Sequence, residues 1–170
     1  MKNLTLEAPT PLAYFAALVA EDDSFALLEA AVCVAHDEHP LLDAHSVLAD
    51  IDRLAGKLKA RLPTDASALR RLQALSQYFF GELGFAGNVN HYHDRRNSYL
   101  HEVLASRRGI PITLALLYCE MAGQLGLSAR GVCFPGHFLI KLRLPQGEVV
   151  IDPFDGRSLS REGGFDGYWQ

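Results

Sequence analysis

One stretch of the chain predicts a helix that must be buried on every side. Residues 112–124 read Ile-Thr-Leu-Ala-Leu-Leu-Tyr-Cys-Glu-Met-Ala-Gly-Gln, which is apolar around nearly the whole helical circumference, and Gly126 then ends the helix. Pro111 stands in the first turn, where proline is best tolerated. The rest of the chain therefore has to be arranged around this segment.

Three stretches after this helix have the pattern of strands, at 129–134, at 137–142 or 137–144, and at 148–152. The second alternates polar and apolar residues, as a half-exposed antiparallel strand does. Leu144-Pro145-Gln146-Gly147 between the last two is a turn, so these two strands should form a hairpin. A central helix followed by a small antiparallel sheet places the chain in the α+β class.

The residues before Gly81 read as packing helices. Thr10-Pro11 and Asp23-Ser24 mark the starts of the first two, the second running from Phe25 to about His36. A third begins at Asp43, and a fourth spans about 66–80 after a turn and cap at 63–65. A further short helix is expected over 99–107, capped by Asn97-Ser98. We expect one domain over 1–170, with a helical part at 1–85 and the central helix and sheet at 86–170.

Composition excludes several classes of function. The 170-residue chain carries a net charge of −4 at pH 7 and has no basic stripe, so no nucleic-acid partner is expected. It has neither an apolar run long enough to cross a bilayer nor a signal-peptide pattern at Met1, and we expect a cytoplasmic protein without membrane contact. The three cysteines, Cys33, Cys119 and Cys133, are interpreted as buried free thiols.

The histidines suggest metal sites only weakly. His36 and His39 straddle a helix end before a proline, and a solvated helix end is the preferred interpretation. His91 and His93 lack a third strong ligand at a motif spacing, although a site shared with His137 stays a weak hypothesis. We expect no metal and no cofactor.

The hairpin register decides whether His137 and Asp152 can meet. A two-residue loop at Gln146-Gly147 puts Asp152 opposite Lys141, whereas a four-residue loop at 143–146, or a bulge, puts it opposite His137. The sequence does not choose between these registers. A hydrogen-bonded pair that only ties two strands together is an equally good interpretation of these residues.

Several motifs in this order resemble the bacterial SirB-type regulator family, whose N-terminal region is a transglutaminase-like domain. They are Asn-Ser-Tyr-Leu at 97–100, Arg-Gly-Ile-Pro-Ile at 108–112, Leu-Gly-Leu at 125–127, Phe-Pro-Gly-His-Phe-Leu at 134–139 and Ile-Asp-Pro-Phe-Asp-Gly at 151–156. The resemblance implies a papain- and transglutaminase-like core. In this family, helical, tetratricopeptide-like repeats usually follow the domain, and we expect them to be absent from this chain.

The resemblance further implies which residues to examine. Active members of the superfamily place a cysteine at the start of the central helix, with a histidine and an aspartate on successive strands. Aligned by Gly109 and Ala115, the cysteine position falls on Pro111, and His137 and Asp152 match the other two. The hydroxyl of Thr113 would point about 200° away from Pro111 around the helix.

Two hypotheses follow. The first is a non-catalytic binding or regulatory module for a protein or peptide partner. The sequence does not determine the oligomeric state of this module. Its groove would lie between residues 109–113 and His137, Asp152 and Gly136, with Asn97, Tyr92 and Arg108 as rims. The second is a hydrolase or acyltransferase that uses Cys133 or Cys119, with His137 as base and Asp152 orienting it.

Overall fold

The computed structural model describes residues 10–18 and 27–159. The helical half comprises α1 (Pro11–Leu18), α2 (Leu27–Cys33), η1 (Val34–Asp37), α3 (Ala44–Arg61), α4 (Ala68–Ser76) and η2 (Gln77–Glu82). The helices expected here are therefore present. The expected cap at Asp23-Ser24 and the C-terminal residues 165–170 lie outside the described residues.

Side-chain caps explain where these helices start. The Ala13 N–H donates to Thr10 Oγ1 at 3.2 Å, and the His45 N–H donates to Asp43 Oδ1 at 3.0 Å, as expected for N-caps. The fourth helix was predicted to start at about residue 66 behind a cap at 63–65, and this is wrong. Ser67 accepts from the Arg70 N–H at 3.2 Å and caps α4, because its hydroxyl is the one that reaches the first turn.

The second half contains the sheet and the central helix. Its elements are β1 (Ala86–Gly87), η3 (Arg95–Ser98), α5 (Leu100–Ser106), β2 (Arg108–Gly109), α6 (Pro111–Gln124), β3 (Ser128–Phe134), β4 (His137–Leu144), β5 (Gly147–Ile151) and β6 (Ser158–Leu159). Strands β3-β4-β5-β6 form an antiparallel meander, and β1 pairs with β2 in parallel. Strands β1, β2 and β6 were not predicted from the sequence, because a stretch of two residues shows no periodicity.

Helix α5 is capped differently from the expectation. Asn97 and Ser98 belong to the 3-10 helix η3 rather than to the cap, and Tyr99 precedes α5 without a side-chain cap. Asp94 caps η3 instead by accepting from the Arg96 N–H at 2.9 Å.

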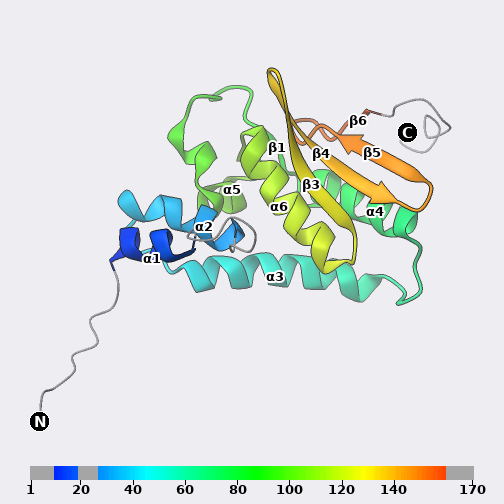
Figure 1. The fold of residues 1–170 in the computed structure, drawn as a ribbon, viewed down its shortest axis with the longest axis horizontal. Helices are drawn as coiled ribbons and strands as arrows, with labels where there is room; N and C mark the ends of the chain where they lie inside the picture. Colours follow the sequence, from blue (N-terminus) through cyan, green and yellow to red (C-terminus); the bar gives the residue numbers. More distant parts are fainter. Residues whose placement is uncertain (1–9, 19–26, 160–170) are drawn as a thin grey trace, which may run out of the picture.

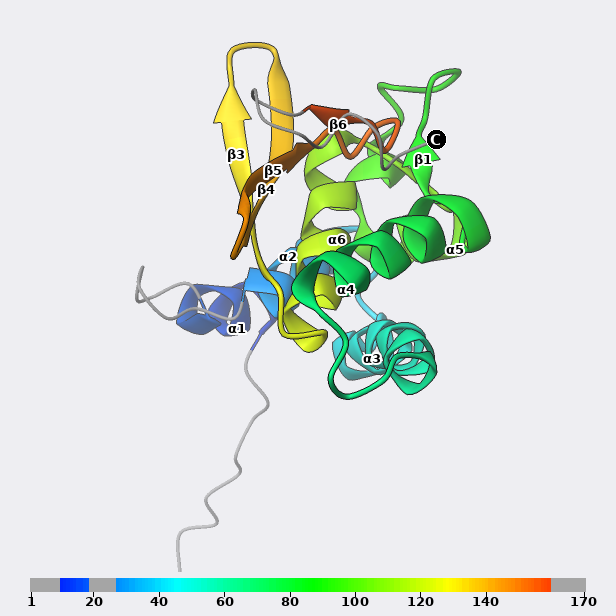
Figure 2. The same ribbon diagram turned by 90° about the vertical axis from the view of Figure 1, so that its right-hand side faces the viewer.

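The all-apolar helix α6 is central, as predicted. It lies between the sheet, which it contacts through β3 and β4, and the helices α2, α3, α4 and α5 (Figures 1 and 2). Leu114, Leu117, Tyr118 and Met121 along it are at most 2% exposed. The fold is therefore α+β.

The hairpin adopts neither of the two expected registers. Leu144 pairs with Gly147 around a loop of Pro145 and Gln146, and Ile140 pairs with Ile151. Continuing this pairing by one residue puts Asp152 beside Leu139, on the face of the sheet that His137 shares and two residues away from it. This intermediate register lets the two side chains approach one corner of the sheet without a bulge.

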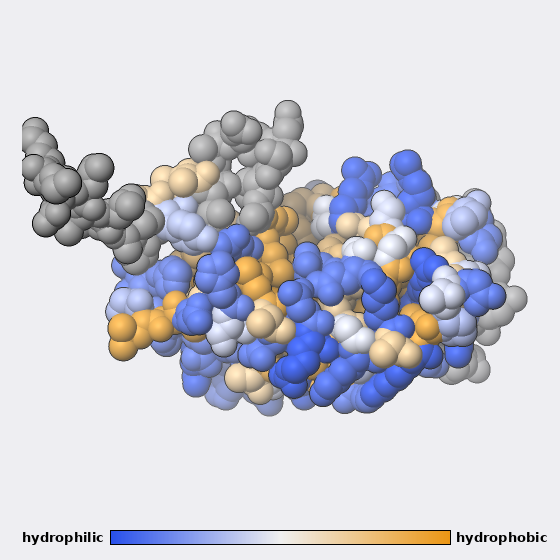
Figure 3. All heavy atoms as spheres, turned by 90° about the horizontal axis from the view of Figure 1, so that it is seen from below, coloured by the Kyte–Doolittle hydropathy of each residue, from blue (hydrophilic) through white to orange (hydrophobic). Residues whose placement is uncertain are grey.

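The outer surface of the helical half is exposed to solvent and mainly polar. Seen from the side of α3, the surface is mainly hydrophilic with small apolar patches (Figure 3). Lys57, Lys59 and Arg61 of α3 are exposed. Among the described helices, none combines the length and apolar character needed to cross a membrane.

Candidate functional site at the start of the central helix

A depression of about 230 Å³ opens where α6 begins and β4 begins. Its lining residues come from four separate segments, and they are Tyr92, Pro111, Gly136, His137, Phe138, Asp152 and Phe154. Five of these seven were predicted as site residues. Phe138 and Phe154 were not, although both stand in the motifs that carry the resemblance.

The start of α6 is fixed by a buried threonine and a glycine. Thr113 is 4% exposed, and its hydroxyl donates to Asn97 O at 2.8 Å while accepting from the Ile110 N–H at 3.2 Å. A Cβ on Gly109 would lie 2.8 Å from Thr113 Oγ1, so only glycine fits beside it. Both residues therefore position the helix start, and neither lines the depression.

A tight turn presents Asp152 and Phe154. Asp152 Oδ1 accepts from the Phe154 N–H at 2.9 Å, and Asp152 O accepts from the Gly156 N–H at 2.8 Å. Phe154 O in turn accepts from the Gly87 N–H at 2.8 Å, and its ring covers Gly87 so closely that a Cβ there would be 2.1 Å away. Strand β1 thus connects this turn to β2 and to the start of α6.

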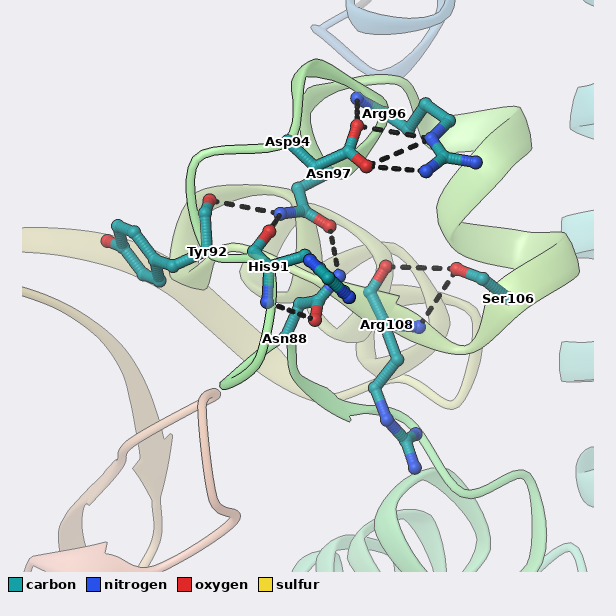
Figure 4. Close-up of polar contacts among 8 residues, drawn as sticks. All are labelled: Asn88, His91, Tyr92, Asp94, Arg96, Asn97, Ser106 and Arg108. Atoms are coloured by element: carbon teal, nitrogen blue, oxygen red, sulfur yellow. Dashed lines mark hydrogen bonds and ion pairs between the residues drawn. The ribbon is translucent and has the colours of Figure 1, made fainter.

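Asn97 holds the loop that carries Tyr92 (Figure 4). Its side chain is 3% exposed and donates to His91 O at 2.7 Å and to Tyr92 O at 3.0 Å. Its Oδ1 accepts from Asn88 Nδ2 at 3.0 Å. The Tyr92 ring projects away from these bonds and lies 6.1 Å from the Phe154 ring, centroid to centroid.

The predicted rim residues therefore separate into two kinds. Tyr92 lines the depression, whereas Asn97 lies beneath the loop and positions it. Arg108 does neither, because its guanidinium donates to Gly84 O at 2.7 Å. Figure 4 shows this side chain extending away from Tyr92 and Asn97.

The three thiols differ in exposure. Cys33 is buried and Cys119 is partly buried, but Cys133 is exposed, so the expectation of three buried thiols is wrong for Cys133. Cys133 lies near the end of β3, which is an edge strand of the sheet. It pairs with Phe138, and because successive residues of a strand alternate, it shares the face of Phe138 rather than that of His137.

Cys119 lies in the interior of α6, away from the depression at the helix start. Burial raises the pKa of its thiol to about 12, which leaves almost no thiolate at neutral pH. Neither Cys119 nor Cys133 lines the depression.

No hydrogen bond or ion pair joins His137 to Asp152 within the part of the chain that the structure describes. The Asp152 carboxylate accepts a hydrogen bond within its own turn. The exposed imidazole of His137 lines the depression. Nor do His91, His93 and His137 form a group of ligand atoms close enough to share a metal ion, within the same described ranges.

The sequence profile described as the transglutaminase-like superfamily matches residues 45–164. A UPF0162 protein of Xylella fastidiosa is 38% identical over 136 residues, which are 80% of this chain and 48% of the relative. A UPF0162 protein of Pseudomonas aeruginosa is 37% identical over 134 residues, covering 79% of this chain and 48% of the relative.

Human F-box only protein 21 is 39% identical over 84 residues, which are 49% of this chain and 13% of that protein. The chain spans about half the length of the UPF0162 relatives it matches. No solved structure matches the chain significantly. The profile covers well over half of the sequence and includes the central helix, His137 and Asp152, so the chain belongs to the transglutaminase-like superfamily.

Proposed function

We propose that this transglutaminase-like domain lacks the catalytic cysteine and acts as a non-catalytic binding or regulatory module. Within the superfamily, the motifs favour a SirB-type regulator of the bacterial cytoplasm. The observation that carries the proposal is the lining of the depression. Pro111 stands at the helix start, across from His137 and Asp152, and none of the seven lining residues is a cysteine.

The lining also suggests what the depression binds. Three aromatic rings and Pro111 offer apolar contacts, while one imidazole and one carboxylate offer polar ones. A peptide segment has both kinds of group, because an apolar side chain can pack among the rings while its backbone amides bond to the polar groups. The ligand would be a protein or peptide segment with an apolar side chain at its centre.

The alternative, a thiol hydrolase or acyltransferase, would need a cysteine beside His137. Cys133 lies on the opposite face of the sheet from His137 and does not line the depression, and burial disfavours the thiolate of Cys119. These positions favour the binding function.

The test of the missing nucleophile uses p-nitrophenyl acetate as an acyl donor. We expect the wild-type chain to release p-nitrophenol no faster than the Cys133→Ser and His137→Ala variants. A Pro111→Cys variant should gain acylation and rapid iodoacetamide labelling at neutral pH, because the helix start and His137 both favour a thiolate. Wild-type hydrolysis that disappears in Cys133→Ser or Cys119→Ser would overturn the proposal.

The test of binding uses decapeptides selected from a random phage-displayed library against the folded chain. Peptides that bind the depression should lose at least about tenfold in affinity, or about 1.4 kcal/mol, in Tyr92→Ala or Phe138→Ala. Arg143→Ala is the matched control, because Arg143 is exposed on β4 at the end away from His137. Equal losses in all three variants, or no selected peptide at all, would contradict a binding role for the depression.

A further inference from the structure

Three side chains that could hold a metal ion meet far from the depression. His39 follows η1 in the helical half, and His101 and Glu102 lie in the first turn of α5. One ligand atom from each lies within 4.8 Å of the other two. We propose that His39, His101 and Glu102 form a binding site for a divalent transition metal ion of the zinc class.

Aromatic packing holds the two imidazoles in place. The rings of His39 and His101 are 4.7 Å apart, centroid to centroid, and nearly perpendicular at 77°. The Tyr99 ring stacks on His101 at 6.1 Å and meets His39 edge-on at 5.6 Å. Because both rings are already ordered, a metal ion would bind them at little cost in side-chain entropy.

The Nδ1 atom of His101 has no hydrogen-bond partner among the described residues. This atom is buried, and Nε2 of the same ring lies 3.7 Å from Glu102 Oε1, beyond hydrogen-bond range. A buried imidazole nitrogen without a hydrogen-bond partner is costly unless a further ligand is supplied.

The spacing is close to that of a bound site. Zinc bonds of about 2.0–2.1 Å in tetrahedral geometry place neighbouring ligand atoms roughly 3.4 Å apart. The cluster therefore needs to contract by on the order of 1 Å at its widest separation. Two imidazoles and a carboxylate suit zinc, and a fourth position would be left for water.

Such an ion would link the two halves of the chain. His39 belongs to the helical half, and α5 leads through β2 directly into the central helix. Binding to the folded state alone would stabilise this connection by mass action. The site could not be predicted from the sequence, because His39 and His101 are distant along the chain and no motif spacing joins them.

The first experiment is a cobalt(II) titration of the purified chain after removal of metals with EDTA. We expect visible d–d absorption that saturates at one equivalent, without the intense near-ultraviolet band of thiolate-to-cobalt charge transfer. Absence of the visible bands in the wild type would overturn the proposal. A thiolate band would overturn it as well, because it would assign the metal to a cysteine.

The second experiment measures thermal unfolding with zinc chloride. At a zinc concentration of about 100 times Kd, we expect Tm to rise by about 5–10 °C. His39→Ala and His101→Ala should abolish the rise, whereas the matched double variant His91→Ala/His93→Ala should keep it. If an alanine variant does not fold, Glu102→Gln decides, since its side chain is 33% exposed and should be tolerated. An undiminished rise in the folded variant would contradict the site.

Discussion

The middle and the start of the same helix, α6, differ in almost every physical respect. In the middle, taken as residues 114–122, Leu114 and Tyr118 are fully buried, and the Tyr118 hydroxyl shares a hydrogen bond of 2.8 Å with Ser76. At the start, Pro111 is half-buried and Ile112 is 44% exposed. Pro111 faces an open depression with an imidazole and a carboxylate in its lining.

This difference separates stability from function. Residues in the middle make the contacts that fold the domain, so their substitution should unfold it. Pro111 and Ile112 at the start make few such contacts, and substitution of Pro111 should alter the depression while the fold persists. Four substitutions test this separation.

The largest effect is expected from Leu114→Ala. Removing a fully buried leucine side chain should lower the free energy of unfolding by about 2–5 kcal/mol, because the apolar contacts are lost and a cavity remains. The control is Ile112→Ala, two residues earlier on the same helix. It should lower the free energy of unfolding by less than about 1 kcal/mol. Urea unfolding followed by circular dichroism measures both. Equal losses would show that the helix start is as much a part of the core as its middle.

A smaller effect is expected from Gly87→Ala, which tests the support of the depression. The new Cβ would lie 2.1 Å from the Phe154 ring, so the ring must move, at a cost of about 1–3 kcal/mol. The aromatic NMR signals of Phe154 and Tyr92 should shift with it. Gly81→Ala is the control, because its Cβ meets nothing within 4 Å and should be neutral or stabilise by up to about 1 kcal/mol.

The sequence predicts the middle of α6 better than its surroundings. A run of about thirteen mainly apolar residues identifies the buried helix. Its start at Pro111 is predicted because proline is best tolerated in the first turn of a helix. The hairpin register did not follow, because Pro145-Gln146 and its neighbours allow several loops of similar turn chemistry. The close approach of the Phe154 ring to Gly87 could not be predicted either, because that contact joins segments distant in sequence.

The site residues follow the same division. His137, Asp152 and Pro111 could be singled out by motif order, and they do line one depression. Asn97 was expected on the rim, but whether a polar side chain points outward or under its own loop depends on contacts that no spacing encodes. Its three hydrogen bonds to the 88–92 loop come from the folded arrangement of β1, β2 and η3.

Asn97→Ala should therefore cost about 1 kcal/mol, because the partners of its amide lie in an exposed loop where water can replace it. The main result should be local. Amide hydrogens of residues 89–94 should exchange faster, while those of α6 keep their protection. Arg108→Ala is the control and should change neither, since its bond to Gly84 O is exposed. Faster exchange throughout α6 would mean that the loop and the helix unfold as one unit.

Pro111→Ala should have the smallest effect on stability. Proline at the first helical position loses no intrahelical hydrogen bond, and it restricts the unfolded chain, so its removal should cost only about 0.4–1 kcal/mol. Peptide binding should weaken more clearly, because the ring of Pro111 forms one wall of the depression. Urea unfolding and peptide titration of the same sample compare the two effects directly. A loss of several kcal/mol in stability with unchanged peptide affinity would reverse the assignment, making the start of α6 a structural element and leaving the depression without a functional wall.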